Sequence, residues 1–380
     1  MVQSRVYVEF GIDMDTIIIA HNYQDTSFSS MSFHLANHLC LIGMRVVFIS
    51  KSPYFTSPTR EKIGDGELIL TSWPSKIKST SFKDFKFIYK ILKEFRPRVV
   101  IGHHNGSIAS MILSKLIGHG KIKTFEYHHV CSESYIRDKG EITFRLKFFL
   151  FRKKLFYHLF CNHVVCPSEF AIADLNHNFN YKKGEIVINP LPDRAIDLKT
   201  KELNGEIIIG YLGRLVPTKN VLELASEFIK FKSSGPKNNI KLKIVGYGED
   251  ESKLKSLIFD VEYIEFIGEL DYNQIDSFIK NCHFTIIPSL ADNLPTAATE
   301  SIMNGIPILI SKGVGTASIL KHKTDAYIFD LKNNGLQNTF KYVNEISQND
   351  YDDLCEISRK TYQKYFLMEA YLKKMKALIA

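Results

Sequence analysis

The feature that most constrains the fold is a regular alternation of short, strongly apolar runs with longer helical patterns. In the first half, the apolar runs are residues 16–20, 45–49, 98–101, 123–127, 163–166 and 186–188. In the second half, they are residues 207–209, 242–245, 264–267, 284–287, 308–310 and 326–329. Such runs between helical patterns are typical of buried parallel strands. About six strands in each half predict an α/β fold made of two Rossmann-like domains.

A polar segment separates the two halves. Asn189-Pro-Leu-Pro-Asp-Arg194 and the charged residues that follow, as far as Gly205, have the composition of a linker. We therefore predict an N-terminal domain over residues 1–192 and a C-terminal domain over residues 205–358, in line with the two domains expected for 380 residues. The last stretch, 351–380, is helical in pattern.

Composition limits the class of protein. A hydrophobic content of 45% and a charged content of 24% are typical of a folded enzyme. No apolar run reaches the ~18 residues needed to span a bilayer, and the first residues lack the apolar core of a signal peptide. The scattered cysteines match neither a zinc nor a redox motif, so we expect reduced core thiols in a cytoplasmic protein. The net charge of +8 suits anionic ligands or an anionic membrane, and we expect no nucleic-acid partner.

A glycine turn with two cations follows the first strand of the second half. Ile207–Ile209 ends in Gly210, and Gly213, Arg214 and Lys219 come after it. Open α/β sheets bind ligands at the carboxyl ends of their strands, and small residues there let a ligand approach the backbone. The fork of an arginine and the point charge of a lysine suit a diphosphate. For the pair alone, a loop with two solvated cations is the alternative.

An acidic pair follows the strand at 284–287. Asp292 and Glu300 are separated by seven residues, with Pro288-Ser289 before them and Gly305-Ile-Pro307 after them. We predict that a helix starts near Thr296, so that its free N–H groups point toward a bound anion. A single glutamate at the start of a helix is usually a surface charge favoured by the helix dipole. The ordered series of strand, Pro-Ser, acid, Glu and Gly-x-Pro favours a ligand site instead.

Together, these segments resemble the donor site of retaining glycosyltransferases of the GT-B fold, of the family-four (group 1) type. The resemblance implies that Arg214 and Lys219 hold the donor diphosphate, that Glu300 hydrogen-bonds the ribose, and that Asp292 or its loop holds the donor sugar. The usual family pattern has glutamate at both acidic positions, so Asp292 is a departure. Because its side chain is shorter by one methylene, the sugar must lie closer or bind through a water.

The resemblance covers residues 205 to 330 closely and the preceding residues only in architecture. It implies further donor-binding positions, namely Gly213, Gly246 beside the donor, Ile267 at the nucleotide base, and the loop residues Asn293, Leu294, Pro295 and Thr296. Glycine-rich turns after strands are common, so Gly246-Tyr-Gly248 alone is weak support. In this fold the final helix, here about 360–380, crosses back to the first domain.

The N-terminal half gives fewer signals. Where the family usually has a Gly-Gly loop after the first strand, this chain has a serine-rich segment, 21–32, which puts a phosphate contact in doubt. Polar residues also follow the strand at 98–101, as His103-His-Asn-Gly106. Relatives carry a histidine after the next strand, beside the transferred sugar. This implies a catalytic His128, with His129 as the alternative register. A neutral imidazole there could bond a sugar hydroxyl or stabilise an oxocarbenium ion, and a histidine with only structural partners is the alternative.

We predict a catalytic set of His128, Arg214, Lys219 and Asp292, with no metal and no cofactor besides the nucleotide-sugar co-substrate. Asp13-Met-Asp15 matches the Asp-x-Asp of metal-dependent GT-A enzymes, but it precedes the first strand, and we interpret it as a chance match. Without a metal, the two cations and helix N-termini would stabilise the leaving group. The resemblance implies front-face attack, in which the leaving phosphate accepts the proton of the acceptor.

The segment 142–160 carries five basic residues and no acidic one. On a helical wheel it has two apolar stripes, one made of Phe144, Phe148, Phe151, Leu155 and Leu159, the other of Leu146, Phe149, Leu150, Phe156 and Phe160. Arg145 and Arg152 separate the stripes on one side, and Lys147 and Lys154 on the other. One stripe can pack in the domain and leave the other for an anionic membrane surface. A buried helix whose long cations reach solvent is the alternative.

The resemblance implies a retaining glycosyltransferase, and the cysteine usage and the basic helix predict that it is cytoplasmic and peripheral on the inner face of the plasma membrane. It would transfer a hexose-type sugar from a UDP- or GDP-sugar to a saccharide or lipid-linked saccharide in bacterial surface polysaccharide synthesis (lipopolysaccharide, capsule or O-antigen). Two alternatives remain. One is a sugar-nucleotide epimerase of similar fold, which needs no acceptor. The other is a non-catalytic subunit that binds the nucleotide sugar.

Overall fold

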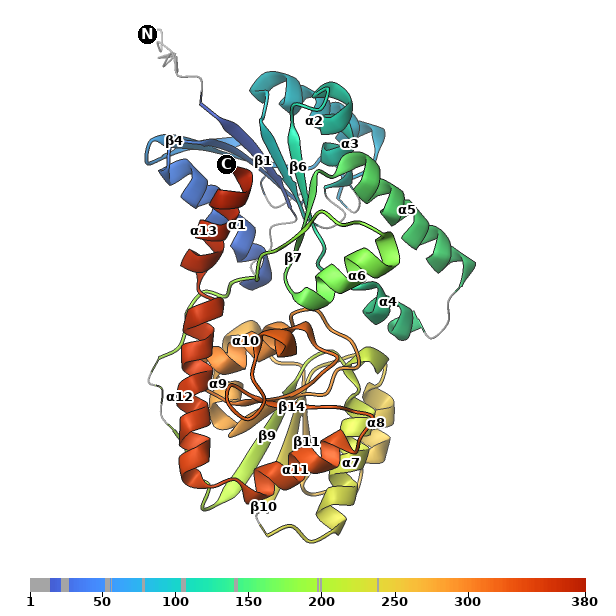
Figure 1. The fold of residues 1–380 in the computed structure, drawn as a ribbon, viewed down its shortest axis with the longest axis vertical. Helices are drawn as coiled ribbons and strands as arrows, with labels where there is room; N and C mark the ends of the chain where they lie inside the picture. The colour runs from blue at the N-terminus through green and yellow to red at the C-terminus, as the bar shows by residue number, and fades with distance from the viewer. Residues whose placement is uncertain are drawn as a thin grey trace, which may run out of the picture. The chain divides into compact units, whose positions relative to one another are not determined.

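The computed structural model confirms the α/β fold, with two largely parallel sheets flanked by helices (Figure 1). It describes residues 14–21, 27–51, 55, 57–76, 79–103, 107–139, 143–196, 198, 200–237 and 239–380. The chain divides into two compact units, residues 1–24 with 32–125 and residues 25–31 with 126–380. This division falls within one strand and not at the predicted linker, and the predicted domain limits stay a prediction.

The first sheet has eight strands in the order β3-β4-β2-β1-β5-β6-β7-β8. In chain order these are β1 (Thr16–Ala20), β2 (Arg45–Ser50), β3 (Thr59–Ile63), β4 (Gly66–Ser72), β5 (Val99–Gly102), β6 (Lys123–Tyr127), β7 (His163–Cys166) and β8 (Gly184–Ile186). The helices among them are α1 (Ser27–Leu41), α2 (Phe82–Phe95), α3 (Ile108–Ile117), α4 (Ser132–Lys139), α5 (Phe144–Phe160) and α6 (Glu169–Phe179). All five residues of β1 are buried between its parallel neighbours β2 and β5, as its continuous apolar run predicts.

One hairpin of this sheet was not predicted. Strands β3 and β4 pair antiparallel around a turn at Gly64, whose φ is +58°. Strand β4 also pairs in parallel with β2 and is buried, but β3 is exposed along most of its length. An edge strand with the sequence Thr-Arg-Glu-Lys-Ile lacks the apolar periodicity on which the prediction relied. The sheet therefore has more strands than the sequence predicts.

The second sheet has six parallel strands in the order β11-β10-β9-β12-β13-β14, with helices on both faces (Figure 1). Its strands are β9 (Glu206–Leu212), β10 (Asn239–Val245), β11 (Ile264–Gly268), β12 (Phe284–Ile287), β13 (Ile308–Ser311) and β14 (Tyr327–Phe329). The α-helices are α7 (Val221–Ser233), α8 (Glu251–Leu257), α9 (Tyr272–Asn281), α10 (Thr296–Met303) and α11 (Gly335–Glu345), and the 3-10 turns are η2 (Pro217–Lys219) and η3 (Gly315–Ile319). Every strand of this sheet was predicted to within a few residues.

Two helices end the chain, α12 (Gln348–Tyr365) and α13 (Met368–Ile379). Buried tyrosines attach both of them to the rest of the second unit. On α12, Tyr351 donates to the carbonyl of His283 and Tyr362 to that of Leu191. On α13, the hydroxyl of Tyr371 lies 2.8 Å from that of Tyr127, at the end of β6. Within the described ranges, no helix is long and apolar enough to cross a membrane.

Candidate functional site

The strand order of the second sheet indicates where a ligand would bind. The chain moves outward from β9 through β10 to β11, then returns to add β12 on the other side of β9. Open α/β sheets bind ligands at such a switch point, beside the carboxyl ends of the two central strands. The loop after β9 carries Arg214 and Lys219, and the loop after β12 carries Asp292. The fold thus brings the predicted cations and the first predicted acid to one place.

The two loops are joined by an ion pair and a backbone hydrogen bond. The ammonium of Lys219 donates to the carboxylate of Asp292, and both side chains are about one-fifth exposed (18% and 19%). The N–H of Leu290 donates to the carbonyl of Thr218 at 2.8 Å. A partly buried, charge-assisted contact of this kind holds a lysine in place. Lys219 and Asp292 are therefore in direct contact, and their roles in donor binding stay predictions.

Arg214 lies beside an acid that the sequence did not indicate. Its side chain is 59% exposed, and its Nη2 is 3.9 Å from Oδ2 of Asp138 on α4. The same carboxylate accepts the N–H of Thr218 at 3.2 Å and also its hydroxyl. Helix α4 reaches the other loop too, because Ser134 donates to the carbonyl of Ala291 at 2.9 Å. Asp138 thus occupies an anion-binding position formed by N–H, hydroxyl and guanidinium donors.

Backbone packing explains why glycine is needed in the turn after β10, whether or not a ligand binds there. Gly246 has φ +146°, and a Cβ there would lie 1.8 Å from the carbonyl oxygen of Gly213. The N–H of Gly213 donates to Val245 at 3.1 Å, so the loops after β9 and β10 are in direct backbone contact. Only glycine allows that approach. Ile267 is 38% exposed near the end of β11. The roles of these three residues in donor binding stay predictions.

The loop between Asp292 and α10 is held by its first residue. Asn293 is 4% exposed, and its amide donates to the carbonyls of His128 at 3.2 Å and His129 at 3.1 Å. Its amide oxygen accepts a hydrogen bond from Ser168. The side chain of Asn293 is therefore committed within the protein, so the predicted contact with a donor would have to come from its backbone.

The other loop residues lead into the predicted helix. Leu294 is half-buried against an apolar cluster, Pro295 precedes the first turn, and α10 begins at Thr296, as predicted. Thr296 is exposed, and no side chain caps this helix start. The N-cap residue Pro295 thus provides no side-chain acceptor for the first N–H groups of α10, although the N–H of Ala298 donates to the carbonyl of Pro295 at 3.1 Å. Contacts of these residues with a donor stay predictions.

Glu300 is buried on α10 and faces a cation from the predicted linker. Its side chain is 3% exposed, and its Oε1 lies 3.3 Å from Nη2 of Arg194. Arg194 makes closer contacts with Asp276, at 2.9 and 3.2 Å. Burial raises the pKa of Glu300 to about 7, with a further rise from Asp276, because the single contact with Arg194 compensates only in part. Neither Arg194 nor Asp276 was predicted from sequence.

Replacing Glu300 with glutamine is expected to remove a pH-dependent loss of stability. Between pH 4.5 and about 7 the folded protein keeps a proton that the unfolded chain has lost. The stability from Glu300 is therefore fully present below pH 4.5 and is lost as the pH rises through 7. Each pH unit is worth about 1.4 kcal/mol, which makes the total about 3 kcal/mol.

Urea unfolding of both proteins at several pH values between 4.5 and 8 measures this effect. We expect the free energy of unfolding of Glu300→Gln, relative to that of the wild type, to increase up to about pH 7 and then to level off. All other titrating groups are common to both proteins and cancel in the difference. A constant difference over the whole range would show that burial does not raise this pKa.

His128 is held by partners inside the protein, as expected for a histidine with a structural role and not a catalytic one. Its imidazole is fully buried, with Nε2 2.7 Å from Asp174 and Nδ1 2.8 Å from the hydroxyl of Tyr157. Burial lowers the pKa of His128 to about 4, and Lys153 lowers it further, against the opposing effect of Asp174. The neutral ring thus donates from Nε2 to the carboxylate and accepts at Nδ1. With both nitrogens committed, this geometry does not support a catalytic role for His128, and the role of the alternative, His129, stays a prediction.

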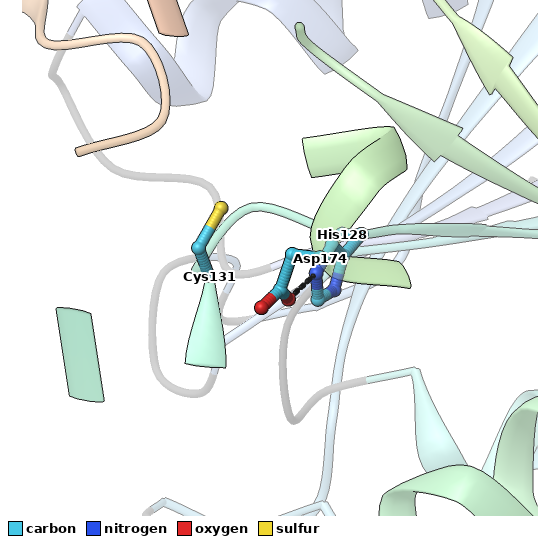
Figure 2. Close-up of side chains that lie close together, drawn as sticks. All are labelled: His128, Cys131 and Asp174. Carbon is cyan, nitrogen blue, oxygen red and sulfur yellow. Dashed lines mark hydrogen bonds and ion pairs between the residues drawn. The ribbon is translucent and has the colours of Figure 1, made fainter. Parts of the chain in front are cut away.

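His128, Cys131 and Asp174 offer ligand atoms that all lie within 4.8 Å of one another (Figure 2). All three side chains are buried. Burial raises the pKa of the Cys131 thiol well above its usual value, and the ammonium of Lys153 lies 3.3 Å from His128 Nδ1. A metal would need the thiolate, and a neighbouring cation opposes metal binding. His128 and Asp174 belong to a hydrogen-bonded core network, and the buried Cys131 thiol lies beside it.

Other polar residues singled out in the sequence lie elsewhere or outside the described residues. Asp15 pairs with Arg98 at 3.0 Å, close to the start of β1. His103, after β5, is buried. Asp13, residues 22–26 of the serine-rich loop, and His104, Asn105 and Gly106 lie outside the described residues. Residues 27–32 of the predicted loop instead form the start of α1, so that part of the prediction is wrong, and a phosphate contact from residues 22–26 stays open.

Two family models match the chain one after the other. Residues 30–192 match the family described as Glycosyltransferase Family 4, and residues 193–361 match the family described as Glycosyl transferases group 1. The boundary between the two matches lies within the predicted linker.

Curated relatives are distant in sequence. The UDP-Gal:alpha-D-GlcNAc-diphosphoundecaprenol alpha-1,3-galactosyltransferase of Escherichia coli is 24% identical over 266 residues, which span 66% of this chain and 67% of that protein. An uncharacterized glycosyltransferase of Methanocaldococcus jannaschii, MJ1178, is 22% identical over 159 residues, or 41% of this chain. The match spans only 42% of the length of that protein.

Solved structures share the fold over nearly the whole chain. HepE of Anabaena, in complex with UDP and glucose, has a TM-score of 0.69 at 10% identity, and the match covers 96% of this chain and 99% of HepE. The lipopolysaccharide outer core galactosyltransferase WaaB has a TM-score of 0.68 at 15% identity, with the same coverage of 96% and 99%. At these identities, the likeness is evidence for the fold alone.

Proposed function

Since this chain belongs to the group 1 glycosyltransferases of the GT-B fold, we propose that it is a retaining hexosyltransferase that uses a UDP- or GDP-sugar. One observation supports the proposal: Lys219 and Asp292, predicted from separate motifs, form an ion pair at the switch point of the second sheet, and Arg214 lies on the same loop as Lys219. Two cations and an acid at this position suit the diphosphate and the sugar hydroxyls of a nucleotide sugar.

Both cations have carboxylate partners in this structure. Lys219 pairs with Asp292, and Arg214 lies close to Asp138. A diphosphate that approached these cations would compete with the carboxylates for the same donors, because both kinds of oxygen accept charge-assisted hydrogen bonds. We propose that donor binding frees Asp292 from Lys219. The carboxylate then becomes an acceptor for a hydroxyl of the donor sugar.

The proposed chemistry exchanges one bond to the anomeric carbon for another. The bond from the sugar C1 to the leaving phosphate oxygen breaks, and a bond from C1 to the acceptor oxygen forms on the same face. The proton of the acceptor hydroxyl moves to the leaving phosphate, so that no protein carboxylate need act as a nucleophile. Arg214, Lys219 and the start of α10 would stabilise the charge that develops on the diphosphate, without a metal.

The proposed acceptor is a saccharide or a lipid-linked saccharide of a bacterial surface polysaccharide. Support comes from the names of two similar proteins: the E. coli relative is named for galactosyl transfer to alpha-D-GlcNAc-diphosphoundecaprenol, and WaaB is named as a lipopolysaccharide outer core galactosyltransferase. Lipopolysaccharide, O-antigen and capsule remain alternative settings. In each of them the enzyme would be cytoplasmic and would work at the inner face of the plasma membrane.

Incubation with nucleotide sugars in excess EDTA tests this chemistry. We expect slow release of sugar from one donor class, at the same rate with EDTA as with added Mg²⁺, and proton NMR should show the released sugar first in the anomeric configuration of the donor. The opposite anomer would contradict retention, and loss of the reaction in EDTA would contradict metal independence. Appearance of an epimeric nucleotide sugar would favour the epimerase, and no turnover of any donor would favour the binding subunit.

A further inference from the structure

Helix α5 is packed on one side only. Its buried side chains are Leu146 and Tyr157, and Leu150 and Phe156 are half-buried beside them. Tyr157, Leu150 and Phe156 join an apolar cluster with residues of β7 and α6, including Val164, Leu175 and Phe179. Figure 1 shows α5 alongside α6. The second of the two predicted apolar stripes therefore packs inward, apart from Phe149, which is 46% exposed.

The other predicted stripe faces outward. It consists of Phe144, Phe148, Phe151, Leu155 and Leu159, whose exposed fractions lie between 43% and 83%. These residues follow one another at helical spacing along nearly the whole of α5, a length of about 25 Å. A row of large apolar side chains in water is unfavourable and marks an interaction surface when it is contiguous.

Cations border this row on both long sides. At helical spacing, Arg145 and Arg152 flank it on one side, and Lys147 and Lys154 flank it on the other. The guanidinium of Arg152 lies over the ring of Phe148, at 5.9 Å from its centroid. The helix contains no acidic residue. Lys153 is the exception among the cations, because it lies on the inner side, near His128.

We propose that this outer face of α5 docks the protein on an anionic lipid bilayer. The helix would lie in the plane of the interface, with its aromatic and leucine row among the upper acyl chains. Its four flanking cations would reach the lipid phosphates from both sides. A protein partner would be expected to contact particular cations and particular apolar side chains of the helix. A row of apolar residues between two purely basic borders instead matches the layered chemistry of a membrane surface. This inference does not rest on the proposed sugar transfer, because it concerns binding without donor or acceptor.

Co-sedimentation with vesicles tests the proposal on the full chain. We expect binding to phosphatidylglycerol–phosphatidylethanolamine vesicles, little binding to phosphatidylcholine vesicles, and weaker binding in high salt. The double variant Phe148→Ser/Phe151→Ser should bind at least tenfold more weakly. Reversing two charges, in Lys147→Glu/Lys154→Glu, should weaken binding more than tenfold, since each basic residue contributes about fivefold.

Matched controls lie on other exposed elements. Phe82 and Phe259 are each 85% exposed, and the variant Phe82→Ser/Phe259→Ser should bind as the wild type does. Lys83→Glu/Lys90→Glu, on exposed positions of α2, makes the same change in net charge. Circular dichroism melts would show that all variants fold.

Three results would overturn the proposal. One is equal binding of the wild type to anionic and neutral vesicles. Another is a loss of binding in the controls as large as that in the α5 variants. The third is a wild-type dimer in analytical ultracentrifugation that Phe148→Ser/Phe151→Ser converts to a monomer, because the outer face would then be covered by a second copy of the chain.

Discussion

Replacing Lys219 with alanine is expected to lower kcat/KM for the nucleotide sugar by about 100-fold or more. Loss of a single pre-organised donor to the developing charge typically costs 10²–10³ in rate. Here the loss has a second component, because Asp292 would keep its negative charge without its lysine partner. An unpaired carboxylate in the diphosphate site repels the donor. The measurement is the initial rate of donor hydrolysis or transfer at several donor concentrations.

Lys253 provides a matched control for this variant. It also pairs with an aspartate, Asp250, at 2.9 Å, but its side chain is 69% exposed. Lys253→Ala should therefore leave the rate unchanged. A Lys219→Ala protein that folds normally and keeps a third or more of the wild-type kcat/KM would show that Lys219 does not hold the donor.

Replacing Asp174 with alanine is expected to lower the free energy of unfolding by about 3–5 kcal/mol, because several buried donors lose their acceptor at about 1–3 kcal/mol each. Its carboxylate accepts hydrogen bonds from His128, from the backbone and hydroxyl of Ser132, and from Asn178. Burial opposes the ionisation of Asp174, but the bond from His128 and those from Ser132 and Asn178 hold its pKa below the usual value. Without the carboxylate, these donors lose their acceptor inside an apolar cluster.

Urea unfolding at pH 7 measures the change. Glu356→Ala is the matched control, because Glu356 also pairs with a lysine, Lys360, but on the exposed surface of α12. A pair of this kind is worth about 0.5 kcal/mol or less. If Asp174→Ala destabilised the protein by less than 1 kcal/mol, the network around His128 could not be assigned a structural role.

The fold was largely predictable because buried parallel strands leave a strong local signal. The strands at 16–20, 123–127, 163–166 and 284–287 have the predicted bounds, since their apolar runs are short and end at polar or turn residues. The β3–β4 hairpin was not predicted, because an exposed edge strand has no apolar run. Its Gly64-Asp-Gly66 turn was the available signal.

The candidate site was predictable only in part, for a different reason. The positions of Arg214, Lys219 and Asp292 follow from motifs at strand ends, and the topology brings them together. The burial of His128 and Asn293 depends on partners far away in the sequence, so no local pattern reveals it.

The same limit explains two residues that the sequence did not indicate. Asp138 meets Thr218 from a polar helix, and Arg194 meets Glu300 from a segment that looks like a linker. Such long-range polar contacts require the fold to be known first. The two stripes of α5 could be predicted from local sequence, but only the structure shows which of them faces outward.

The central claim is that the second sheet carries a nucleotide-sugar site built around Arg214 and Lys219. The most direct measurement is the thermal shift of the wild type and of Arg214→Ala, Lys219→Ala and Glu300→Ala with a panel of UDP-, GDP-, ADP- and CMP-sugars. One donor class should raise the Tm of the wild type but of none of the three variants. If no donor shifts the wild type, or if the variants respond as it does, the donor site does not lie where these residues meet.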